Sequence, residues 1–69
     1  MAIPGHLQRA LDERVDLDAK REKLAAFMET DTFQSLDEAE RDLLAWQATV
    51  MSNYSGILTR RLTNAGIDA

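Results

Sequence analysis

The side chains with the greatest chemical potential in this sequence are basic groups and one phenol. A guanidinium group forms forked hydrogen bonds with phosphate and carboxylate oxygens, and a tyrosine ring stacks on planar bases. In a polar pocket between subunits, such groups would hold a planar or phosphorylated ligand. The candidate ligand-binding residues are Arg14, Lys20, Arg21, Tyr54 and Arg61.

A second basic group is expected at one end of the fold. His6, Arg9 and Arg60 would gather there, and the free amides at the start of the first helix would strengthen an anion-binding site. A structural interpretation also stands, in which Arg60 and Arg61 only complement the negative end of the second helix. The opposite end would be acidic, with Asp31, Asp37, Glu38, Glu40 and Asp42.

The sequence offers little for catalysis. It contains one histidine, no cysteine and no glycine-rich loop, and its serines have no base or acid at a diagnostic spacing. Acidic pairs such as Glu13 with Asp16 could hold a hard cation, but charged helix surfaces produce such pairs constantly. We therefore expect a protein that is not an enzyme and that uses no metal or other cofactor.

A long first helix is needed to position the residues of the first half. Pro4 suits the first turn of a helix, and no glycine or proline interrupts residues 6–29. This predicts a helix over about residues 4–29 with one apolar side. Its apolar positions recur every seven residues, at Ile3, Ala10, Leu17 and Leu24.

A turn over residues 30–35 is expected to follow. Threonine and aspartate side chains there compete with helical hydrogen bonds, and Phe33 would plug the end of the core. Ser35 and Glu38 then match a capping box, which predicts the start of a second helix over about residues 36–64.

The end of the second helix is also marked in the sequence. Gly66 follows Asn64 and Ala65 and offers a left-handed stop, while Gly56 predicts a weak point or a close helix contact inside the helix. Two helices of similar length with a short connection must fold back on each other. The expected fold is therefore all-α, a single domain over residues 1–69 built as an antiparallel two-helix hairpin.

The side chains between the two helices are predicted to alternate between apolar and polar layers. The apolar pairs would be Leu24 with Leu43, Leu17 with Val50 and Ala10 with Ile57, with Leu44, Met51 and Leu58 along the other edge of the same face. The polar layers would pair Arg21 with Gln47, Arg14 and Glu13 with Tyr54, and His6 with Arg61.

Buried charge is costly unless it is paired, so the polar layers need a reason. Three stay open: register-fixing ion pairs with Glu13, Asp18 or Glu22, a ligand pocket between subunits, and docking on a partner protein.

The length and charge of the chain bear on its partners. A hairpin of 69 residues leaves much apolar surface uncovered, so we expect a homo-oligomer that completes a helical bundle. The net charge of −4 disfavours nucleic acid as a partner. No apolar run approaches the length of a membrane span and the first residues lack a signal-peptide pattern, so we expect no membrane contact and a cytoplasmic location.

A pattern of residues spread over about residues 6–62 has a counterpart in a known family. It comprises His6, Arg9, Asp12, Glu13, Arg14, Leu17, Asp18, Lys20, Lys23, Leu24 and Phe27, then Phe33, Leu36, Glu40, Tyr54, Leu58 and Arg61. In these positions the chain resembles the crAss-like phage related small protein family. The resemblance implies a bacteriophage origin and a two-helix hairpin, and it includes no catalytic motif.

Three hypotheses for function follow by analogy with small phage proteins that act by binding. In the first, an oligomer acts as a sponge in the host cell cytoplasm and sequesters a nucleotide-type immune signal, a cyclic nucleotide or an ADP-ribose-type messenger. In the second, the acidic end with Asp37, Glu38 and Asp42 occludes a basic host protein, such as a nucleic-acid-binding defence protein, in the manner of an anti-CRISPR inhibitor. In the third, the chain is a structural or regulatory bundle.

Overall fold

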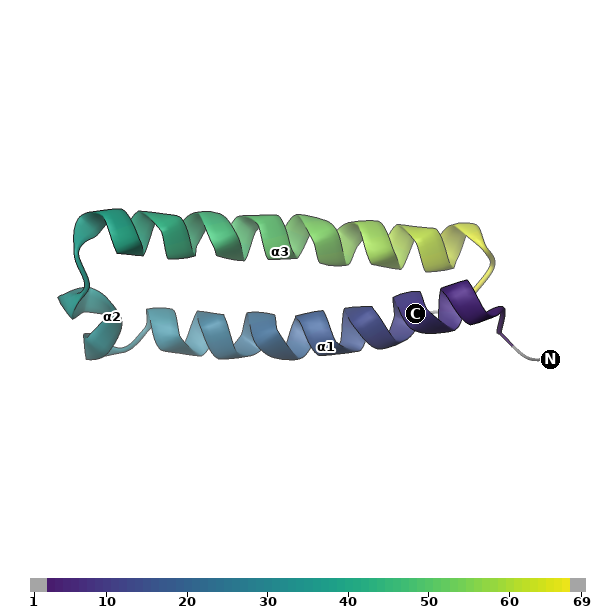
Figure 1. Cartoon of the computed structure of the whole chain (residues 1–69), viewed down its shortest axis with the longest axis horizontal. Helices are drawn as coiled ribbons and strands as arrows, with labels where there is room; N and C mark the ends of the chain where they lie inside the picture. The colour runs from purple at the N-terminus through teal and green to yellow at the C-terminus, as the bar shows by residue number, and fades with distance from the viewer. Residues whose placement is uncertain (1–2, 68–69) are drawn as a thin grey trace.

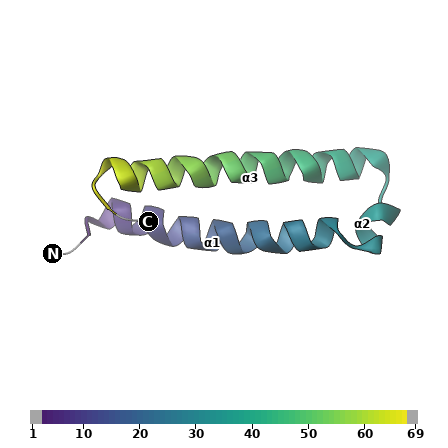
Figure 2. The same cartoon turned by 180° about the vertical axis from the view of Figure 1, so that it is seen from behind.

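The computed structural model describes residues 3–67 and shows an all-helical hairpin (Figure 1). Its two long helices, α1 (Gly5–Met28) and α3 (Glu38–Asn64), lie side by side and antiparallel, and the short helix α2 (Asp31–Ser35) joins them. Seen from behind, the start of α1 again lies beside the end of α3 (Figure 2). The rod measures 50 × 15 × 15 Å. The all-helical prediction is confirmed.

Across residues 3–67, no helix combines the length and the apolar character that a bilayer crossing requires.

The start of α1 depends on Pro4, as the sequence indicates. Its carbonyl oxygen accepts hydrogen bonds from the backbone N–H groups of Leu7 and Gln8, at 3.0 and 2.9 Å. Proline has no N–H group and its φ of −51° is close to the helical value, so it enters a helix at little cost. Within residues 3–67, no side chain caps this end of α1.

The connection between the long helices differs from the predicted turn, because residues 31–35 form α2. The hydroxyl oxygen of Thr30 accepts a hydrogen bond from the backbone N–H of Phe33 at 3.2 Å and so caps this helix. Phe33 is buried, and its ring meets that of Phe27 edge to face, with the ring centres 6.0 Å apart. The predicted role of Phe33 as a plug at the end of the core is confirmed.

The predicted cap of the second long helix is wrong. Asp37 occupies the N-cap position of α3, and its carboxylate accepts a hydrogen bond from the backbone N–H of Glu40 at 2.7 Å. Ser35 cannot serve there because it is the last residue of α2, and its hydroxyl donates to the carbonyl oxygen of Thr32. A cap residue needs an extended backbone, which Asp37 has with ψ of 161°.

The end of α3 follows the predicted left-handed stop. Gly66 has φ of +80°, a conformation that other residues rarely adopt. The backbone N–H of Ile67 donates to the carbonyl oxygen of Leu62, and that of Gly66 donates to Thr63, both at 2.9 Å. This pair of bonds is the Schellman motif, and Ile67 also packs against the apolar cluster that contains Leu62.

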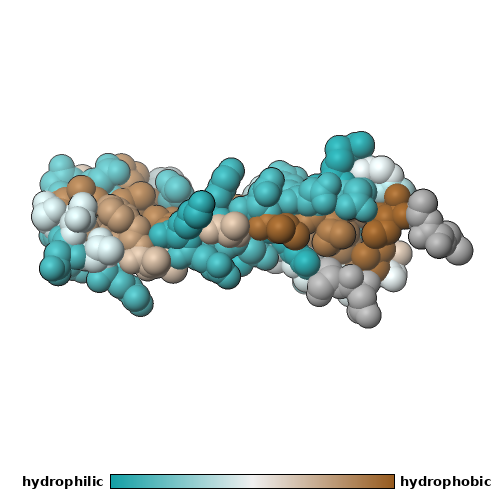
Figure 3. All heavy atoms as spheres, turned by 90° about the horizontal axis from the view of Figure 1, so that it is seen from below, coloured by the Kyte–Doolittle hydropathy of each residue, from teal (hydrophilic) through white to brown (hydrophobic). Residues whose placement is uncertain are grey.

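The buried apolar side chains lie at the two ends of the hairpin, and half-buried ones, Leu17, Leu24, Leu44 and Met51, lie between them. Near the start of α1, a cluster joins Leu7, Ala10, Leu58 and Leu62, and at the other end the two phenylalanine rings meet. On the face drawn in Figure 3, hydrophobic residues likewise gather largely towards the two ends.

The predicted apolar layers are wrong for one edge of the second helix. Leu43, Val50 and Ile57 were expected to face α1, but each is more than half exposed. The opposite edge turns inward instead, where Leu44 and Met51 are half-buried and Leu58 is fully buried. The two edges point in directions about a third of a turn apart, so α1 covers only one of them. The result is a second apolar line on α3 that the hairpin leaves uncovered.

Candidate functional site

A polar network holds α1 and α3 together in the middle of the hairpin. The carboxylate of Asp18 on α1 accepts a hydrogen bond from the hydroxyl of Ser55 on α3 at 2.7 Å. The same carboxylate oxygen accepts from the Nη1 of Arg21, one turn further along α1, at 2.9 Å. Ser55 is buried, so its hydroxyl needs such a partner.

The hydrogen bonds that Asp18 accepts favour the ionised form of its carboxylate. The hydrogen bond from Ser55 is the largest influence, followed by that from Arg21, and together they hold the pKa of Asp18 below its usual value. Asp18 is therefore ionised over the neutral range and keeps the guanidinium of Arg21 in place. The ion pair between Arg21 and Asp18, named in one of the three interpretations of the polar layers, is present here within α1, and the hydrogen bonds to Ser55 and Ser52 link it to α3.

Two of the five candidate ligand-binding residues connect to hydroxyl groups of α3. Arg21 donates through its Nη2 to the hydroxyl of Ser52 at 3.2 Å, while Gln47, its predicted layer partner, donates to the sulfur of Met51. Arg14 donates through its Nη1 to the hydroxyl of Thr59 at 3.5 Å. Both arginines are half-buried, and each keeps further N–H groups for other acceptors.

Tyr54 and Arg61 lie on the opposite side of the seam between the helices. The phenol of Tyr54 donates a hydrogen bond to the carboxylate of Glu13, which confirms that predicted contact. This bond raises the pKa of the Tyr54 phenol above its usual value, while the nearby charge of Arg61 acts in the opposite direction. Lys20 is exposed and lies seven residues after Glu13, on the same side of α1. The five candidates thus divide into two groups rather than forming one pocket within a single copy.

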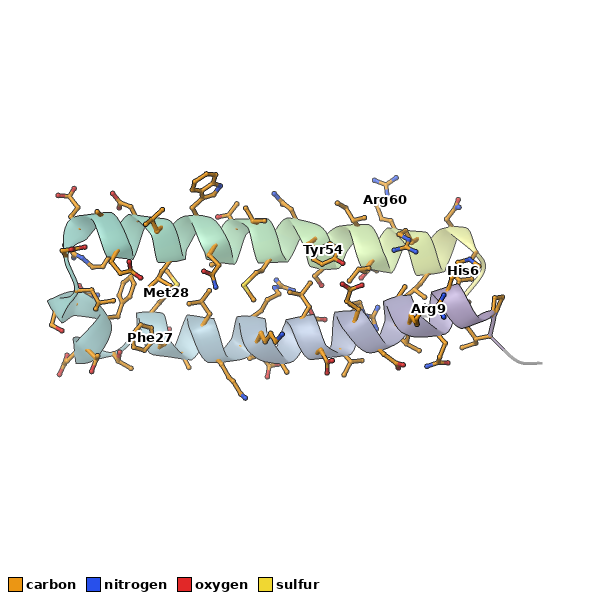
Figure 4. All side chains as sticks on the ribbon, in the orientation of Figure 1. His6, Arg9, Phe27, Met28, Tyr54 and Arg60 are labelled. Carbon is orange, nitrogen blue, oxygen red and sulfur yellow. The ribbon has the colours of Figure 1, made fainter. Side chains whose placement is uncertain are left out.

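The predicted anion site is only partly assembled in one copy. His6 and Arg9 lie at the start of α1, near the end of α3, whereas Arg60 points away from α1 (Figure 4). All three side chains are exposed. The side chain of Arg60 therefore lies on a different part of the surface from those of His6 and Arg9.

A shallow surface hollow of about 570 Å³ unites two of the arginines with hydroxyl groups. We name it the arginine–hydroxyl hollow. Gly56 lies in it, and a Cβ atom on this glycine would meet no neighbouring heavy atom within 4 Å, so the close helix contact considered for Gly56 does not occur here. The hollow is lined by Arg21, Ser52, Asn53, Ser55, Gly56, Ile57, Thr59 and Arg60.

The hydroxyl residues of the hollow were missed in the sequence. Ser52, Ser55 and Thr59 are spaced by three and four residues, which places them on one side of a helix. This spacing was available, but short polar side chains on a helix are common and carry no signal alone. Only the position of Arg21 on the facing helix identifies them as a group that could bind an anion.

The arrangement suits binding of a phosphorylated molecule. Guanidinium groups bind phosphate oxygens with charge-assisted hydrogen bonds, and hydroxyl and amide groups bind ribose and phosphate oxygens. The volume of the hollow falls within the usual range for small-molecule sites, about 300–1,000 Å³. It is open on one side, so a single copy surrounds a ligand only in part.

Comparisons with known proteins give one match. A sequence model of a protein family described as Sequestin matches residues 4–64, nearly the whole chain. No curated protein and no solved structure matches the chain.

Proposed function

The chain belongs to the Sequestin family, and from this membership we propose that it binds and withholds a small phosphorylated molecule of the nucleotide class. The family name indicates a sequestering role, which is a binding activity. Sequestration needs a tight stoichiometric site and no chemical step. The ligand, in this proposal, is a host immune signal, either a cyclic nucleotide or an ADP-ribose-type messenger.

The observation that carries the proposal is the arginine–hydroxyl hollow. Arg21 reaches it from α1 and is oriented by Asp18, while Arg60 extends from α3. Arg60 has no side-chain hydrogen bond or ion pair among residues 3–67, so its guanidinium group is available to a ligand. In this proposal the remaining N–H groups of Arg21, the guanidinium of Arg60 and the hydroxyls of Ser52 and Thr59 form a local anion site in a chain of net charge −4.

Tyr54 and Arg61 extend the proposal to the other side of the seam. A phenol ring and a neighbouring guanidinium group can stack on a base and hold a phosphate, respectively. Lys20 would add a positive charge on the same side. In this arrangement the ligand bridges copies of the protein, which act as a homo-oligomer in the cytoplasm of a phage-infected cell.

The test is isothermal titration calorimetry with a panel of cyclic dinucleotides, cyclic trinucleotides and cyclic ADP-ribose isomers. We expect stoichiometric heat from one class of these compounds. Arg60→Gln should weaken that binding about tenfold or more, because a charge-assisted hydrogen bond contributes about 1.5–3 kcal/mol. The matched control is Lys23→Gln, which removes the same charge from an exposed position outside both the hollow and the Tyr54 group. No heat from any compound would overturn the proposal.

Two further variants separate the sides of the seam. Tyr54→Phe keeps the ring and removes the hydroxyl that Glu13 accepts from, so a loss of affinity would assign the phenol oxygen a direct role. Reversal of Glu38, which lies outside the hollow, the Tyr54 group and the uncovered apolar line on α3, should leave the heat of binding unchanged. If that reversal instead abolished activity in cells while ligand binding persisted, the acidic end would be the functional surface.

A further inference from the structure

α3 carries a line of exposed hydrophobic side chains on the side that α1 leaves open. We name it the outer stripe. Its members recur at intervals of three, four and seven residues, the spacing of a helix that packs against another helix. They are Leu43, Trp46, Val50 and Ile57, which are 54%, 67%, 52% and 56% exposed.

The outer stripe is too long to be an accident of surface composition. From Leu43 to Ile57 it extends about 21 Å along the helix axis at 1.5 Å per residue. Large apolar side chains exposed singly are normal, whereas an indole and three branched side chains in one line indicate an interaction surface. Asn53 continues the three- and four-residue spacing between Val50 and Ile57.

We propose that a second copy of this chain binds the outer stripe with its own outer stripe, with the two α3 helices antiparallel. The charges beside the stripe determine the direction. Glu40 and Asp42 flank its beginning, and Arg60 and Arg61 flank its end. An antiparallel pair places each acidic end beside a basic end, whereas a parallel pair would place like charges together.

An open hollow at the end of the stripe lies where a side chain of the second helix would pack in such a pair. It measures about 610 Å³, and its walls include Ile57, Arg60, Arg61 and Asn64. These four positions are related as i, i+3, i+4 and i+7, the set that forms the hole for one side chain of a facing helix. Leu43 of the second copy fits this hole in the antiparallel arrangement.

The register follows from placing Leu43 in that hole. Trp46 of one copy then lies against Ile57 of the other, and Val50 lies against Asn53. The two-fold axis passes between these last two positions. On the flank of the stripe that faces α1, Glu40 of one copy meets Arg61 of the other, and symmetry forms this ion pair twice.

This dimer completes the arginine–hydroxyl hollow, a statement that depends on the proposed function. Asn53, Ile57 and Arg60 belong both to the stripe region and to the lining of the hollow. A second copy seated on the stripe therefore covers the open side of the hollow. The ligand would then be enclosed by two chains, whereas the hollow of one copy is open on one side.

The first experiment is sedimentation equilibrium without any ligand, at about 100 µM, where an interface of standard size is populated. The wild-type chain should give twice its mass of 7.8 kDa. Val50→Asp should weaken the association at least about tenfold, since it removes two apolar side chains beside the two-fold axis and places two carboxylates in the interface there. The matched control is Val15→Asp on α1, which starts from a valine that is 58% exposed and lies outside the stripe. A wild-type mass of 7.8 kDa, or equal effects of the two variants, would overturn the proposal.

The second experiment tests the antiparallel direction by exchanging charges. Glu40→Arg and Arg61→Glu should each weaken the dimer about tenfold, because each change turns two attractive pairs into two repulsive ones. The double variant should restore wild-type association. Residues 40 and 61 lie about 31 Å apart along one helix, so a rescue can arise only between copies. A double variant that is no better than the single ones would overturn the antiparallel pairing.

The two proposals fail separately in these measurements. Sedimentation uses no ligand, and calorimetry reports ligand binding whatever the mass of the protein. A dimer that gives no heat with any compound would overturn the proposed function alone. A monomer that binds a compound would overturn the dimer and the bridging of copies by the ligand, and would leave the sequestering activity standing.

Discussion

One apolar edge of α3 faces α1 and the other faces outward, and this difference gives a quantitative prediction for two neighbouring residues. Leu58 is 0% exposed and Ile57 is 56% exposed, although both are aliphatic and adjacent in the chain. Truncation of either residue to alanine removes three carbon atoms. At about 0.8 kcal/mol per buried carbon group, Leu58→Ala loses about 2.4 kcal/mol of transfer free energy. The cavity left behind brings the expected loss into the range of about 2–5 kcal/mol.

Ile57→Ala should cost much less. Less than half of this side chain is buried in one copy, so the same arithmetic gives a loss of about 1 kcal/mol. It leaves no closed cavity, because the side chain borders solvent. The predicted difference between the two variants therefore exceeds 1 kcal/mol in the single chain.

The assay is urea unfolding followed by far-UV circular dichroism, at a protein concentration below the dissociation constant of the proposed dimer. Linear extrapolation gives the free energy of unfolding of each variant, and unchanged slopes show that the unfolding reaction is the same. Similar losses for Leu58→Ala and Ile57→Ala would refute the assignment of the inner face. A larger loss for Ile57→Ala would show that Leu43, Val50 and Ile57 face α1 after all.

Two further predictions concern the middle of the hairpin. Gly56→Ala should stabilise the protein by about 1 kcal/mol and raise the melting temperature by about 4–8 °C, since its Cβ meets nothing within 4 Å, and calorimetry that shows a lower melting temperature would contradict this. The lowered pKa of Asp18 means that its ionised form stabilises the fold above the usual carboxyl pKa of 3.8, and that this stabilisation is lost as the pH falls through the lowered value. The free energy of unfolding should thus differ between wild type and Asp18→Asn at neutral pH and converge in acid. Ser55→Ala should weaken this pH dependence, and a difference independent of pH would count against the network.

Much of the helical architecture was readable from local signals. Pro4 marks the start of α1 and Gly66 marks the end of α3, because each residue has a backbone preference that acts without help from the rest of the fold. Phe33 was placed correctly as an end plug, since a large apolar ring in a short connection has few other places to go. Such signals arise from a residue and its neighbours in the chain, so they do not depend on how the two helices pack.

The cap of α3 shows where local signals compete. Ser35 and Asp37 are both good N-cap residues, and Ser35 with Glu38 forms the more familiar sequence pattern. The structure extends residues 31–35 into α2, which makes Ser35 helical and leaves Asp37 as the cap. α2 is capped by Thr30, and its Phe33 packs on Phe27 of α1, so the helical state of Ser35 accompanies a contact that the capping-box pattern does not include.

The candidate site was only partly predictable for a related reason. The sequence indicated that Arg14, Arg21 and Tyr54 lie in the seam, and it identified Glu13 as the partner of Tyr54. It did not indicate that the first two face hydroxyl groups of α3 while the third lies on the other side. A rotation of α3 about its own axis by a fraction of a turn would change which of its side chains face α1. The periodicity of the sequence does not fix the angle of that rotation.

The sequence by itself determined that this chain forms two long helices, where they end, and that apolar and basic residues share their faces. Those features follow from backbone preferences and from the helical period, which are local. Only the tertiary structure decided which of the two apolar edges of α3 packs on α1 and which is left as the outer stripe. Both edges carry three large apolar side chains, Leu43, Val50 and Ile57 on one and Leu44, Met51 and Leu58 on the other, so side-chain hydrophobicity alone does not choose between them. The contacts that accompany the inner edge include the bond from Ser55 to Asp18 and the packing of Ile67 on the Leu62 cluster, and these join residues that are distant in the sequence.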